Sequence, residues 1–551
     1  MSGSPHDTGR GEAAPVAPAD RTLPAFLAAA AERWGDREAV VWGDVRWTYR
    51  DLAREAARVA DGLRALGVGK GDPVGVLLPN WPEFFATVFG ATALGAVAVC
   101  LNTMATEPEL AFALDHARVR WLVYTPAFLR HDYERSLASF GVDRAPAERS
   151  AARDLVARVA LVRAGEVPDG ARDYRSLGSS PADGAARLRE LDAASPDQPA
   201  VIFFTSGSTA KPKGVVHAHQ ALVHQAFVAS DAFGLAPEDR SWGCLPMFFA
   251  GGFVIIALIT FATGGATVLQ DHFVAEEALD LFERERVTFY AGWQLAPALV
   301  DHPSFAGRSL ALRKGIFTTS PAAPKLLRPD HVSVGAYGLS ETATVVCLAR
   351  SDDPPELRQR GFGRPLPGVE LRVIDPETGG QRARGEVGEI LVRGPSLMLG
   401  YLGIPPSQTF TPDGFFRTGD YGRVDESGTL LFDGRLKEVI KTAGVNVAAA
   451  EVEACLEAAA GVAAAYVVPV AHAVRGENVA AFVVPKPGAT IERDALVAHC
   501  KRELASYKVP RHLFVLPAAD VPRTGTQKVD KPRLRREAAE LAGGDRDLLA
   551  S

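Results

Sequence analysis

The 551-residue sequence predicts an α/β fold with three parts. These are a large N-terminal domain of helix-covered, mostly parallel sheets, a small barrel-like β subdomain attached to it, and a small, mobile α+β domain at the C-terminus. Apolar runs alternate with helical patterns over the first part of the chain, which is typical of parallel sheets covered on both faces. From Gly361 short strands with regular Gly/Pro turns follow, and from about Lys437 a new α/β pattern begins.

These changes of pattern predict the domain boundaries. We expect a disordered tail over residues 1–20, a large domain over residues 21–434, a small C-terminal domain over residues 435–540 and a second tail over residues 541–551. The first tail is small, polar and proline-rich, and it lacks the apolar core of a signal peptide.

The first elements have recognisable start and stop signals. Thr48, with Asp51 three residues later, predicts a capping box, and Gly67 closes the helix that begins there. Residues 38–42 and 45–47 flank a Gly-Asp turn, which predicts a hairpin. Further expected elements are helices over residues 23–34 and 107–117 and strands over residues 72–78 and 121–124.

One uncharged stretch, Phe84–Leu101, approaches the length of a membrane span. It contains threonines and glycines and has no basic flank, so we expect a buried helix that leads into a strand over residues 96–101. Residues 130–197 are rich in Ala, Arg, Ser and Pro and are expected to form surface helices. Later expected elements are helices over residues 219–233, 254–261 and 275–285, and strands over residues 267–269, 287–290, 315–319, 332–338, 369–374, 388–393, 417–424 and 428–433.

The composition excludes several classes of protein. Hydrophobic residues make up 47% and charged residues 23% of the chain, as in ordinary soluble proteins. The net charge of -6 and the lack of a basic tract give no support for nucleic-acid binding. The five cysteines are scattered, without Cys-x-x-Cys or His-Glu-x-x-His, so neither a disulfide framework nor a zinc site is indicated. Reduced thiols favour a cytoplasmic location.

The chain is organised around the segment Thr205–Gly214, which lies between two apolar runs that predict strands. Its glycines let backbone N–H groups turn toward an anion, its hydroxyls donate hydrogen bonds, and its lysines supply charge, so it suits a polyphosphate. It is not a Walker A loop, because no Gly-Lys-Ser/Thr ends it and a strand follows. The alternative is a flexible surface loop. The candidate phosphate-binding residues are Thr205, Ser206, Gly207, Ser208, Thr209 and Lys213.

Five motifs in one order resemble the signatures of the adenylate-forming superfamily. This superfamily includes acyl-CoA synthetases, adenylation domains of peptide synthetases and beetle luciferases. The resemblance extends over about residues 22–535. The motifs are Thr205–Gly214, Tyr337-Gly-Leu-Ser-Glu-Thr342, Arg417-Thr-Gly-Asp420, Gly434-Arg-Leu-Lys-Glu-Val-Ile-Lys441 and Pro522-Arg-Thr-Gly-Thr-Gln-Lys528.

The resemblance implies a two-step ligase that uses ATP, Mg²⁺ and CoA. A carboxylate first attacks the α-phosphate of ATP to give acyl-AMP and pyrophosphate. Because two anions meet, such a site needs a cation and a divalent metal. By resemblance, Tyr337 stacks on adenine, Ser340 binds phosphate and Glu341 is both catalytic and the magnesium ligand. An ordinary acid at a helix N-terminus is the alternative for Glu341.

The remaining site residues are also implied by resemblance. Asp420 binds the ribose, and Arg435 is a second ribose or phosphate contact. Lys528 is the catalytic lysine that bridges the acid and the α-phosphate. Lys437 is the hinge about which the small domain rotates between the two steps. Lys441 is a catalytic phosphate contact, and Gly444 lies near the pantetheine tunnel.

Departures from the family pattern concern the acceptor more than the adenylation step. Phe249 stands where many CoA ligases carry a histidine, and Ala443 replaces a lysine that some relatives use near CoA. Further departures are Ala449, Ser320-Pro321 and Gln527.

The turn that contains Phe249, Gly251 and Gly252 suggests an apolar or aromatic acyl group. An α-amino acid is disfavoured because Asp231 and Asp239 lie in or after a polar helix, away from a position that could bind its ammonium group.

Three functional hypotheses therefore stand. The first is a CoA ligase for an apolar or aromatic carboxylic acid. The second keeps adenylation but uses another acceptor or substrate: the thiol of a separate carrier protein, an amine, or an unusual oxyanion. The third is a non-catalytic ATP-binding relative, which loss of Glu341, Asp420 or Lys528 would favour; all three residues are present. The partners are small molecules, without nucleic acid or a membrane span, and the oligomeric state stays open.

Overall fold

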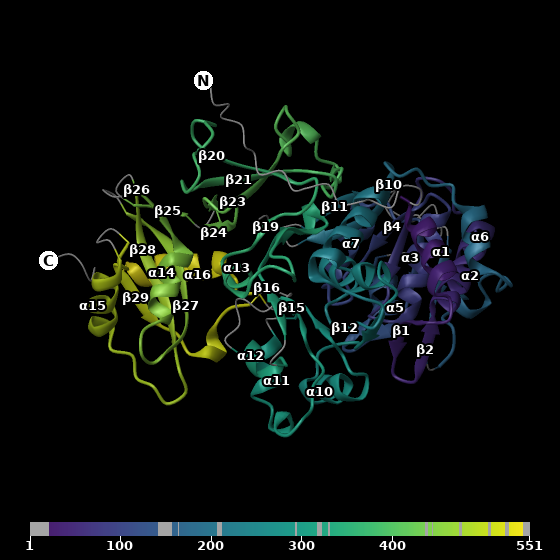
Figure 1. The fold of residues 1–551 in the computed structure, drawn as a ribbon, viewed down its shortest axis with the longest axis horizontal. Helices are drawn as coiled ribbons and strands as arrows, with labels where there is room; N and C mark the ends of the chain where they lie inside the picture. Colours follow the sequence, from purple (N-terminus) through teal and green to yellow (C-terminus); the bar gives the residue numbers. More distant parts are fainter. Residues whose placement is uncertain are drawn as a thin grey trace. The chain divides into compact units, whose positions relative to one another are not determined.

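The computed structural model describes residues 21–140, 157–163, 165–205, 212–292, 295–316, 322–328, 331–435, 439–442, 445–472, 476–504, 508–523 and 528–543 (Figure 1). The chain divides into two compact units. Unit 1 comprises Met1–Leu371, Val392–Phe416 and Gly428–Leu430, and unit 2 comprises Arg372–Leu391, Arg417–Ser427 and Leu431–Ser551. In the described part of the chain, every helix is too short or too polar to cross a lipid bilayer.

An eight-stranded sheet is the first of two large sheets in unit 1. Its order is β22-β11-β10-β4-β3-β5-β8-β9. The strands from β10 to β9 run parallel, whereas β11 and β22 pair antiparallel at one edge. The strands are β3 (Pro73–Leu77), β4 (Val97–Cys100), β5 (Trp121–Tyr124), β8 (Ala157–Ala160), β9 (Ala171–Asp173), β10 (Pro199–Thr205), β11 (Lys213–Ala218) and β22 (Gly400–Tyr401).

A seven-stranded sheet is the second, with the order β16-β15-β14-β12-β13-β1-β2. All its pairs are parallel except the hairpin of β1 and β2, which confirms the predicted Gly-Asp turn. The strands are β1 (Glu38–Trp42), β2 (Val45–Thr48), β12 (Arg240–Gly243), β13 (Ala266–Leu269), β14 (Phe289–Tyr290), β15 (Lys314–Ile316) and β16 (Val332–Val334).

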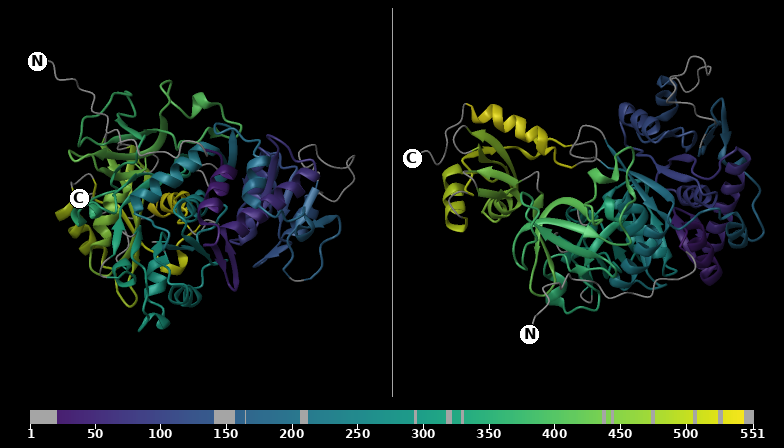
Figure 2. Two further views of the ribbon diagram at one scale, coloured as in Figure 1. Left: turned by 45° about the vertical axis from the view of Figure 1, so that its right-hand side comes forward. Right: turned by 90° about the horizontal axis from the view of Figure 1, so that it is seen from above.

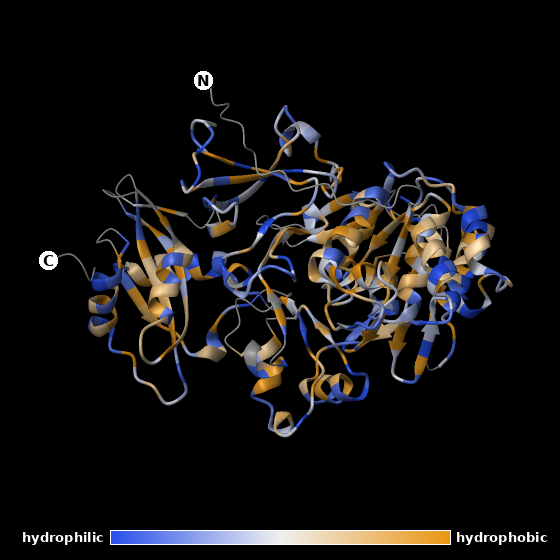
Figure 3. Ribbon diagram, viewed as in Figure 1, coloured by the Kyte–Doolittle hydropathy of each residue, from blue (hydrophilic) through white to orange (hydrophobic). Residues whose placement is uncertain are grey.

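Helices cover these sheets, and the apolar residues of the strands lie beneath them (Figure 3). All residues of α3 are buried, as expected for a helix that is apolar on every side. Its Phe85 lies 5.4 Å from Phe261 and 6.4 Å from Phe253 between ring centroids, and Phe203 of β10 lies 6.1 Å from Phe253. The helices of unit 1 are α1 (Leu23–Trp34), α2 (Tyr49–Ala65), α3 (Pro82–Ala93), α4 (Glu107–His116), α5 (Tyr133–Ser139), α6 (Gly184–Leu191), α7 (His219–Phe233), α8 (Ala250–Gly252), α9 (Ile259–Phe261), α10 (Ala275–Arg284), α11 (Ala296–Val300), α12 (Ala323–Leu326) and α13 (Pro355–Gln359).

Unit 2 holds the greater part of a four-stranded sheet and the whole of a C-terminal sheet. The four-stranded sheet has the order β20-β21-β23-β24, formed by β20 (Glu370–Ile374), β21 (Gly388–Arg393), β23 (Phe416–Val424) and β24 (Leu430–Arg435). The C-terminal sheet contains β25 (Val439–Thr442), β26 (Val445–Ala448), β27 (Val462–His472), β28 (Gly476–Pro485) and β29 (His512–Val515).

Helices cover both faces of the C-terminal sheet. Neighbouring residues of a strand point to opposite faces, so adjacent residues of β27 pack against different helices. Val467 packs with residues of α14 (Ala449–Glu457) and α15 (Arg493–Glu503). Val468, the next residue of β27, packs with Leu534 and Ala538 of α16 (Lys531–Ala542). Figure 2 shows α16, in yellow, along this sheet.

Most predicted elements are confirmed, including the capping box of Thr48 and Asp51 and the buried helix that leads into β4. Three predictions were wrong in part. Residues 130–197 contain two strands, β8 and β9, besides helices. Phe253–Leu258 is a π-helix rather than part of one α-helix. The strand predicted over residues 332–338 is split into β16 and β17 (Ala336–Leu339), which belong to different sheets.

At the split, Gly335 lies against the backbone of another segment. A Cβ atom at Gly335 would lie 2.0 Å from the carbonyl oxygen of Gly361, so the chain passes this point only as glycine. Beyond it, β17 joins a three-stranded sheet with β18 (Thr344–Leu348) and β19 (Arg364–Pro365).

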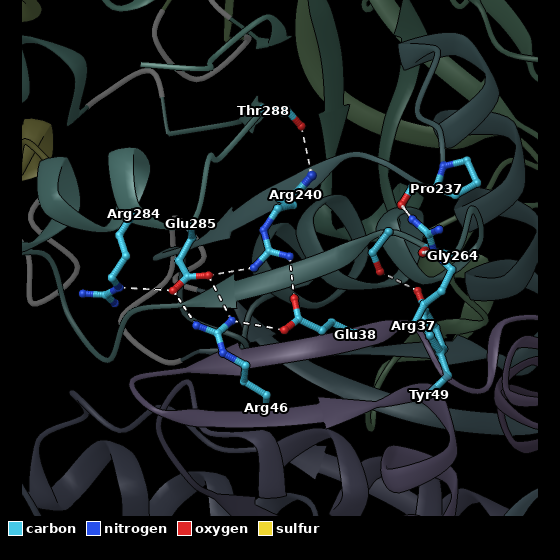
Figure 4. Close-up of polar contacts among 11 residues, drawn as sticks. Arg37, Glu38, Arg46, Tyr49, Pro237, Arg240, Gly264, Arg284, Glu285 and Thr288 are labelled. Atoms are coloured by element: carbon cyan, nitrogen blue, oxygen red, sulfur yellow. Dashed lines mark hydrogen bonds and ion pairs between the residues drawn. The ribbon is translucent and has the colours of Figure 1, made fainter. Parts of the chain in front are cut away.

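An ion-pair network links three strands of the seven-stranded sheet, β1, β2 and β12, near the starts of β1 and β12 (Figure 4). The carboxylate of Glu285 accepts two hydrogen bonds from Arg46, at 2.8 and 3.0 Å, and one of 2.8 Å from Arg240. Arg240 also donates to Glu38 at 2.6 Å, and Arg284 donates to Glu285 at 3.1 Å. The bonds from Arg46 above all lower the pKa of Glu285 to about 2. The network therefore joins β1, β2, β12 and the end of α10.

Candidate active site

The predicted phosphate loop connects two strands of an antiparallel hairpin. Thr205, the last residue of β10, lies opposite Lys213, the first residue of β11. Both side chains are half-buried. The flanking strands predicted from the sequence are thus confirmed. Ser206, Gly207, Ser208 and Thr209 lie outside the described residues.

The motif Tyr337–Thr342 begins in β17 and ends in a single 3-10 turn, Ser340–Thr342, before β18. Thr342 is fully buried, and its hydroxyl oxygen lies 2.6 Å from the carbonyl oxygen of Thr344 and accepts a 3.0 Å hydrogen bond from the N–H of Leu339. The turn ends with Ala343 at φ 48° and Thr344 at φ 86°, a left-handed conformation that side chains disfavour. Such strain persists only where surrounding contacts enforce it, and it gathers at functional sites.

Glu341 is brought together with Lys213, although 128 positions separate them in the sequence of 551 residues. The hydroxyl of Tyr401 donates a 2.7 Å hydrogen bond to Oε1 of Glu341. The ammonium group of Lys213 lies 4.6 Å from the centroid of the Tyr401 ring. Tyr401 thus links a predicted metal ligand to a predicted phosphate ligand.

The backbone of the same turn is held by two further contacts. His217 of β11 contacts the carbonyl oxygen of Ser340 through Nε2 at 2.7 Å, and the N–H of Met398 donates to the carbonyl oxygen of Glu341 at 2.8 Å. His217 is fully buried, and this burial lowers its pKa to about 4. The imidazole is therefore neutral near pH 7, and the contact requires its proton to be on Nε2. Tyr337 is also buried, with its ring 6.4 Å from that of Phe362.

A second turn, after β12, carries the predicted acyl-pocket residues. Phe249 is half-buried, and its ring centroid lies 4.6 Å from that of Phe248 in an edge-to-face arrangement. Gly251 and Gly252 follow in α8. A Cβ atom at Gly252 would lie 2.3 Å from the carbonyl oxygen of Pro246, so only glycine allows this close approach.

Asn80, just after β3, holds this second turn in place. Its side-chain amide lies 3.0–3.3 Å from the carbonyl oxygens of Gly243, Cys244, Leu245 and Gln270, and its Oδ1 accepts a 2.9 Å bond from the N–H of Met247. Asn80 is 2% exposed. One buried amide therefore connects the ends of β3, β12 and β13.

These segments share a position in the fold. The phosphate loop follows the carboxyl end of β10, and the Phe249 turn follows that of β12, a strand parallel to its neighbours in the other sheet. In open α/β sheets, ligands bind beyond the carboxyl ends of the strands. The arrangement of unit 1 is thus that of a ligand-binding edge.

In unit 2, Asp420 lies in β23 and is 3% exposed. The neighbouring Arg417 forms a two-point ion pair with buried Glu389 of β21, at 2.5 and 3.1 Å. Arg435 is the last residue of β24, and Lys441 lies in β25 opposite Asn446. Lys528 is exposed and precedes Val529, which forms an isolated antiparallel bridge with Arg523. Lys437 and Gly444 lie outside the described residues.

Sequence reasoning missed the supporting residues Asn80, His217 and Tyr401. Each contacts a segment far away in the chain, so a local pattern carries no sign of it. The Gly400-Tyr401 pair followed an apolar run and offered a strand signal, but not the partner of its hydroxyl group. Within the described residues, no cluster of three or more potential metal-ligating side chains occurs.

Comparisons with known proteins agree with these motifs. The family model described as AMP-binding enzyme matches residues 27–402, and that of the AMP-binding enzyme C-terminal domain matches residues 451–528. A 3-[(3aS,4S,7aS)-7a-methyl-1,5-dioxo-octahydro-1H-inden-4-yl]propanoyl:CoA ligase from Rhodococcus jostii is 32% identical, and the match covers 94% of this chain and 98% of the relative.

Two solved structures are similar over nearly the whole chain. An anthranilate CoA ligase in complex with anthranoyl-AMP has a TM-score of 0.80 and 25% identity, covering 96% of this chain and 99% of that one. An amide bond synthetase from Marinactinospora thermotolerans has a TM-score of 0.79 and 29% identity, covering 93% and 99%. The chain belongs to the AMP-binding enzymes of the adenylate-forming superfamily and is an AMP-forming acid–thiol ligase of the acyl-CoA synthetase type.

Proposed function

We propose that the protein converts a carboxylic acid with an apolar or aromatic acyl group into its CoA thioester. In the first step, a carboxylate oxygen attacks the α-phosphorus of ATP, the bond to pyrophosphate breaks, and acyl-AMP is formed. In the second step, the sulfur of CoA attacks the acyl carbon, AMP leaves, and the thiol loses its proton. The observation that carries the choice of acid is the aromatic turn of Phe248 and Phe249 beyond β12.

The two carboxylates considered as partners for an ammonium group are engaged elsewhere, which supports an uncharged acyl group. Asp239 is buried and binds Lys314 at 2.7 Å and Arg313 at 3.0 Å, before β12 begins, at the opposite end of that strand from the aromatic turn. Asp231 pairs with Arg350 at 3.0 Å. Both carboxylates are thus already used by other side chains, which argues against their binding the ammonium group of an α-amino acid.

Each predicted site residue has a task in this scheme. Thr205, Lys213 and Ser340 bind the phosphates, with the loop residues Ser206, Gly207, Ser208 and Thr209. Tyr337 contacts adenine, and Asp420 and Arg435 bind the ribose. Lys528 stabilises the charge that develops as the acid meets the α-phosphate. Rotation about Lys437 brings Lys441 and Gly444 into use for the second step.

Glu341 is the proposed ligand of Mg²⁺, and its chemistry fits this ion. Mg²⁺ is commonly held by one or two carboxylates together with substrate phosphates. Oε1 of Glu341 accepts the bond from Tyr401, and Oε2 has no donor among the described residues. The bound ion would neutralise phosphate charge during the first step.

A second candidate acceptor is an amine, because one of the similar structures is an amide bond synthetase. Phe249 and Ala443, which replace polar residues that the family resemblance leads one to expect, favour this alternative. A separate carrier-protein thiol is the remaining alternative acceptor. The cytoplasmic location and the domain boundary at residues 434–435 also stay predictions.

The test is pyrophosphate release with Mg-ATP across a panel of aliphatic, aromatic and amino acids, each with CoA, with an amine, or with neither. Release that depends on an aromatic or apolar acid, together with a CoA thioester in the mass spectrum, is the expected result. An amide product with no thioester would move the assignment to the amine. Release with amino acids alone would overturn the proposed acyl class.

A further inference from the structure

Tyr401 occupies a position between the phosphate hairpin and the turn that contains Glu341. It is the last residue of β22, which pairs with β11 so that Tyr401 lies opposite Val215. Two backbone hydrogen bonds of 2.8 Å fix this pairing, from Leu399 N–H to the carbonyl oxygen of Val216 and from Leu402 N–H to that of Gly214. The phenol is therefore carried by a strand rather than by a free loop.

The same short segment holds Glu341 at two points. The N–H of Met398 donates to its carbonyl oxygen at 2.8 Å, and the hydroxyl of Tyr401 donates to its Oε1 at 2.7 Å. With both the backbone and one carboxylate oxygen fixed, the rotation of the side chain is restricted. Within the described residues, Oε2 is left without a donor and keeps its lone pairs for a cation.

Lys213 adds an electrostatic contribution. Its ammonium group lies 4.6 Å from the centroid of the Tyr401 ring, within the range of a cation–π contact. A positive charge over the ring withdraws electron density and makes the phenol a stronger hydrogen-bond donor. Because the acceptor is ionised, the bond to Glu341 is of the stronger, charge-assisted type.

We propose that Tyr401 is a positioning residue that orients the Glu341 carboxylate for a divalent cation held with ATP. This inference rests on the proposed role of Glu341. Hydrogen-bond partners behind a metal ligand fix its orientation, and their loss commonly weakens metal binding by about 10–100-fold. Tyr401 itself touches neither the cation nor the reacting atoms in this proposal.

The test measures metal binding rather than turnover. Mn²⁺ is titrated into the full-length protein with the non-hydrolysable analogue α,β-methylene-ATP, and free Mn²⁺ is followed by electron paramagnetic resonance. Tyr401→Phe is expected to raise the Kd of Mn²⁺ by about 10–100-fold. The matched control is Tyr133→Phe, which removes a buried hydroxyl that donates a 2.6 Å bond to the carbonyl oxygen of Thr103. This control should keep the wild-type Kd.

A double variant separates positioning from an independent effect. If Tyr401 acts only through Glu341, then adding Tyr401→Phe to Glu341→Gln leaves the Kd of Glu341→Gln unchanged. An unchanged Kd in Tyr401→Phe alone, or additive effects in the double variant, would overturn the proposal. So would a Glu341→Gln variant that binds Mn²⁺ like the wild type.

The inference and the proposed function fail in different ways. If the wild-type protein releases no pyrophosphate with any acid, but Tyr401→Phe still lowers the affinity for Mn²⁺, the proposed function is refuted and the inference stays in place. A wild-type protein that forms acyl-AMP, with a Tyr401→Phe variant of unchanged Mn²⁺ affinity, would refute the inference alone.

Discussion

Charged side chains are paired differently at the starts and at the carboxyl ends of the parallel strands in unit 1. At the starts, Glu285 is surrounded by three arginines, and Asp239 binds Lys314 and Arg313. At the ends, the only donor to the side chain of Glu341 among the described residues is the neutral Tyr401, and Lys213 faces an aromatic ring. Charges are thus neutralised where the sheet needs stability and are left available where ligands are expected to bind.

The largest expected effect comes from comparing Lys213, at the carboxyl ends of the strands, with Lys314, at their starts. Lys213→Met removes a proposed phosphate ligand and should lower the rate of pyrophosphate release on the order of 100-fold, with little change in thermal stability. Lys314→Met leaves buried Asp239 with one cation fewer and should reduce the free energy of unfolding by about 1–3 kcal/mol. Calorimetry and single-turnover kinetics check both. If Lys314→Met lowered the rate as much as Lys213→Met, the contrast between the two ends would be wrong.

Acid should act first through two buried histidines, His217 of β11 and His219 at the start of α7. The buried site of His217 lowers its pKa to about 4, and burial lowers the pKa of His219 likewise to about 4. In the unfolded chain, a histidine side chain has a pKa of about 6.5. The folded protein therefore loses up to about 1.4 kcal/mol of stability per pH unit and histidine as the pH falls from 6.5 to 4. Urea unfolding across this range measures the slope, and His217→Gln should flatten it. A slope that His217→Gln leaves unchanged would contradict the assignment.

Glu285 should act in a lower pH window. Its pKa of about 2, held down chiefly by Arg46, means that its contribution is complete above about pH 4.5 and is lost as the pH falls toward 2. Glu285→Gln should lower the free energy of unfolding by about 1–2 kcal/mol at pH 7 and leave the rate of pyrophosphate release unchanged. The same variant at pH 2 should unfold like the wild type, and a persistent difference there would show that charge is not the cause.

The smallest expected effect concerns Asn80, a residue for which stability and ligand binding should not be separable. Asn80 supports the Phe249 turn, so stability and substrate binding should both depend on it. Asn80→Asp replaces the donating amide with an acceptor that repels the surrounding carbonyl oxygens. We expect the KM for the acid to rise about tenfold, equal to about 1.4 kcal/mol, while the KM for ATP changes less. Initial rates at varied acid and varied ATP decide this, and equal changes in both KM values would contradict it.

The architecture was predictable from the sequence where the hydrophobic periodicity was clear and turn or capping residues marked the ends of elements. The alternation of elements, the hairpin around Gly43-Asp44 and the strands on either side of Thr205–Gly214 are all confirmed. The short strands β8 and β9 were missed because an Ala/Arg-rich segment has no clear alternation, and their pairing comes from the edge of an existing sheet. The break at Gly335 was missed because the residue lies against Gly361, a contact that a local sequence pattern does not reveal.

The candidate site was predictable only for residues that carry the chemistry within a motif. Lys213 stood out because lysines beside glycine and hydroxyl groups suit phosphate, and Glu341 was assigned by the resemblance of its motif to that of the family. Asn80, His217 and Tyr401 did not, because each acts on a partner that only folding brings near. His217 and Ser340, for example, are 123 positions apart.

The chain leaves unit 1 at Leu371 and returns at Val392 before it leaves again. Tyr401 lies in this returning segment, whereas Glu341 and Lys213 lie in the first one. A gene fragment that stops at residue 371 would encode every phosphate-loop residue and the Glu341 turn, but not the strand that supports them. In a recombinant with a relative, residues 21–371 and 392–416 should therefore come from the same parent, even where the 20 residues between them, 372–391, come from the other.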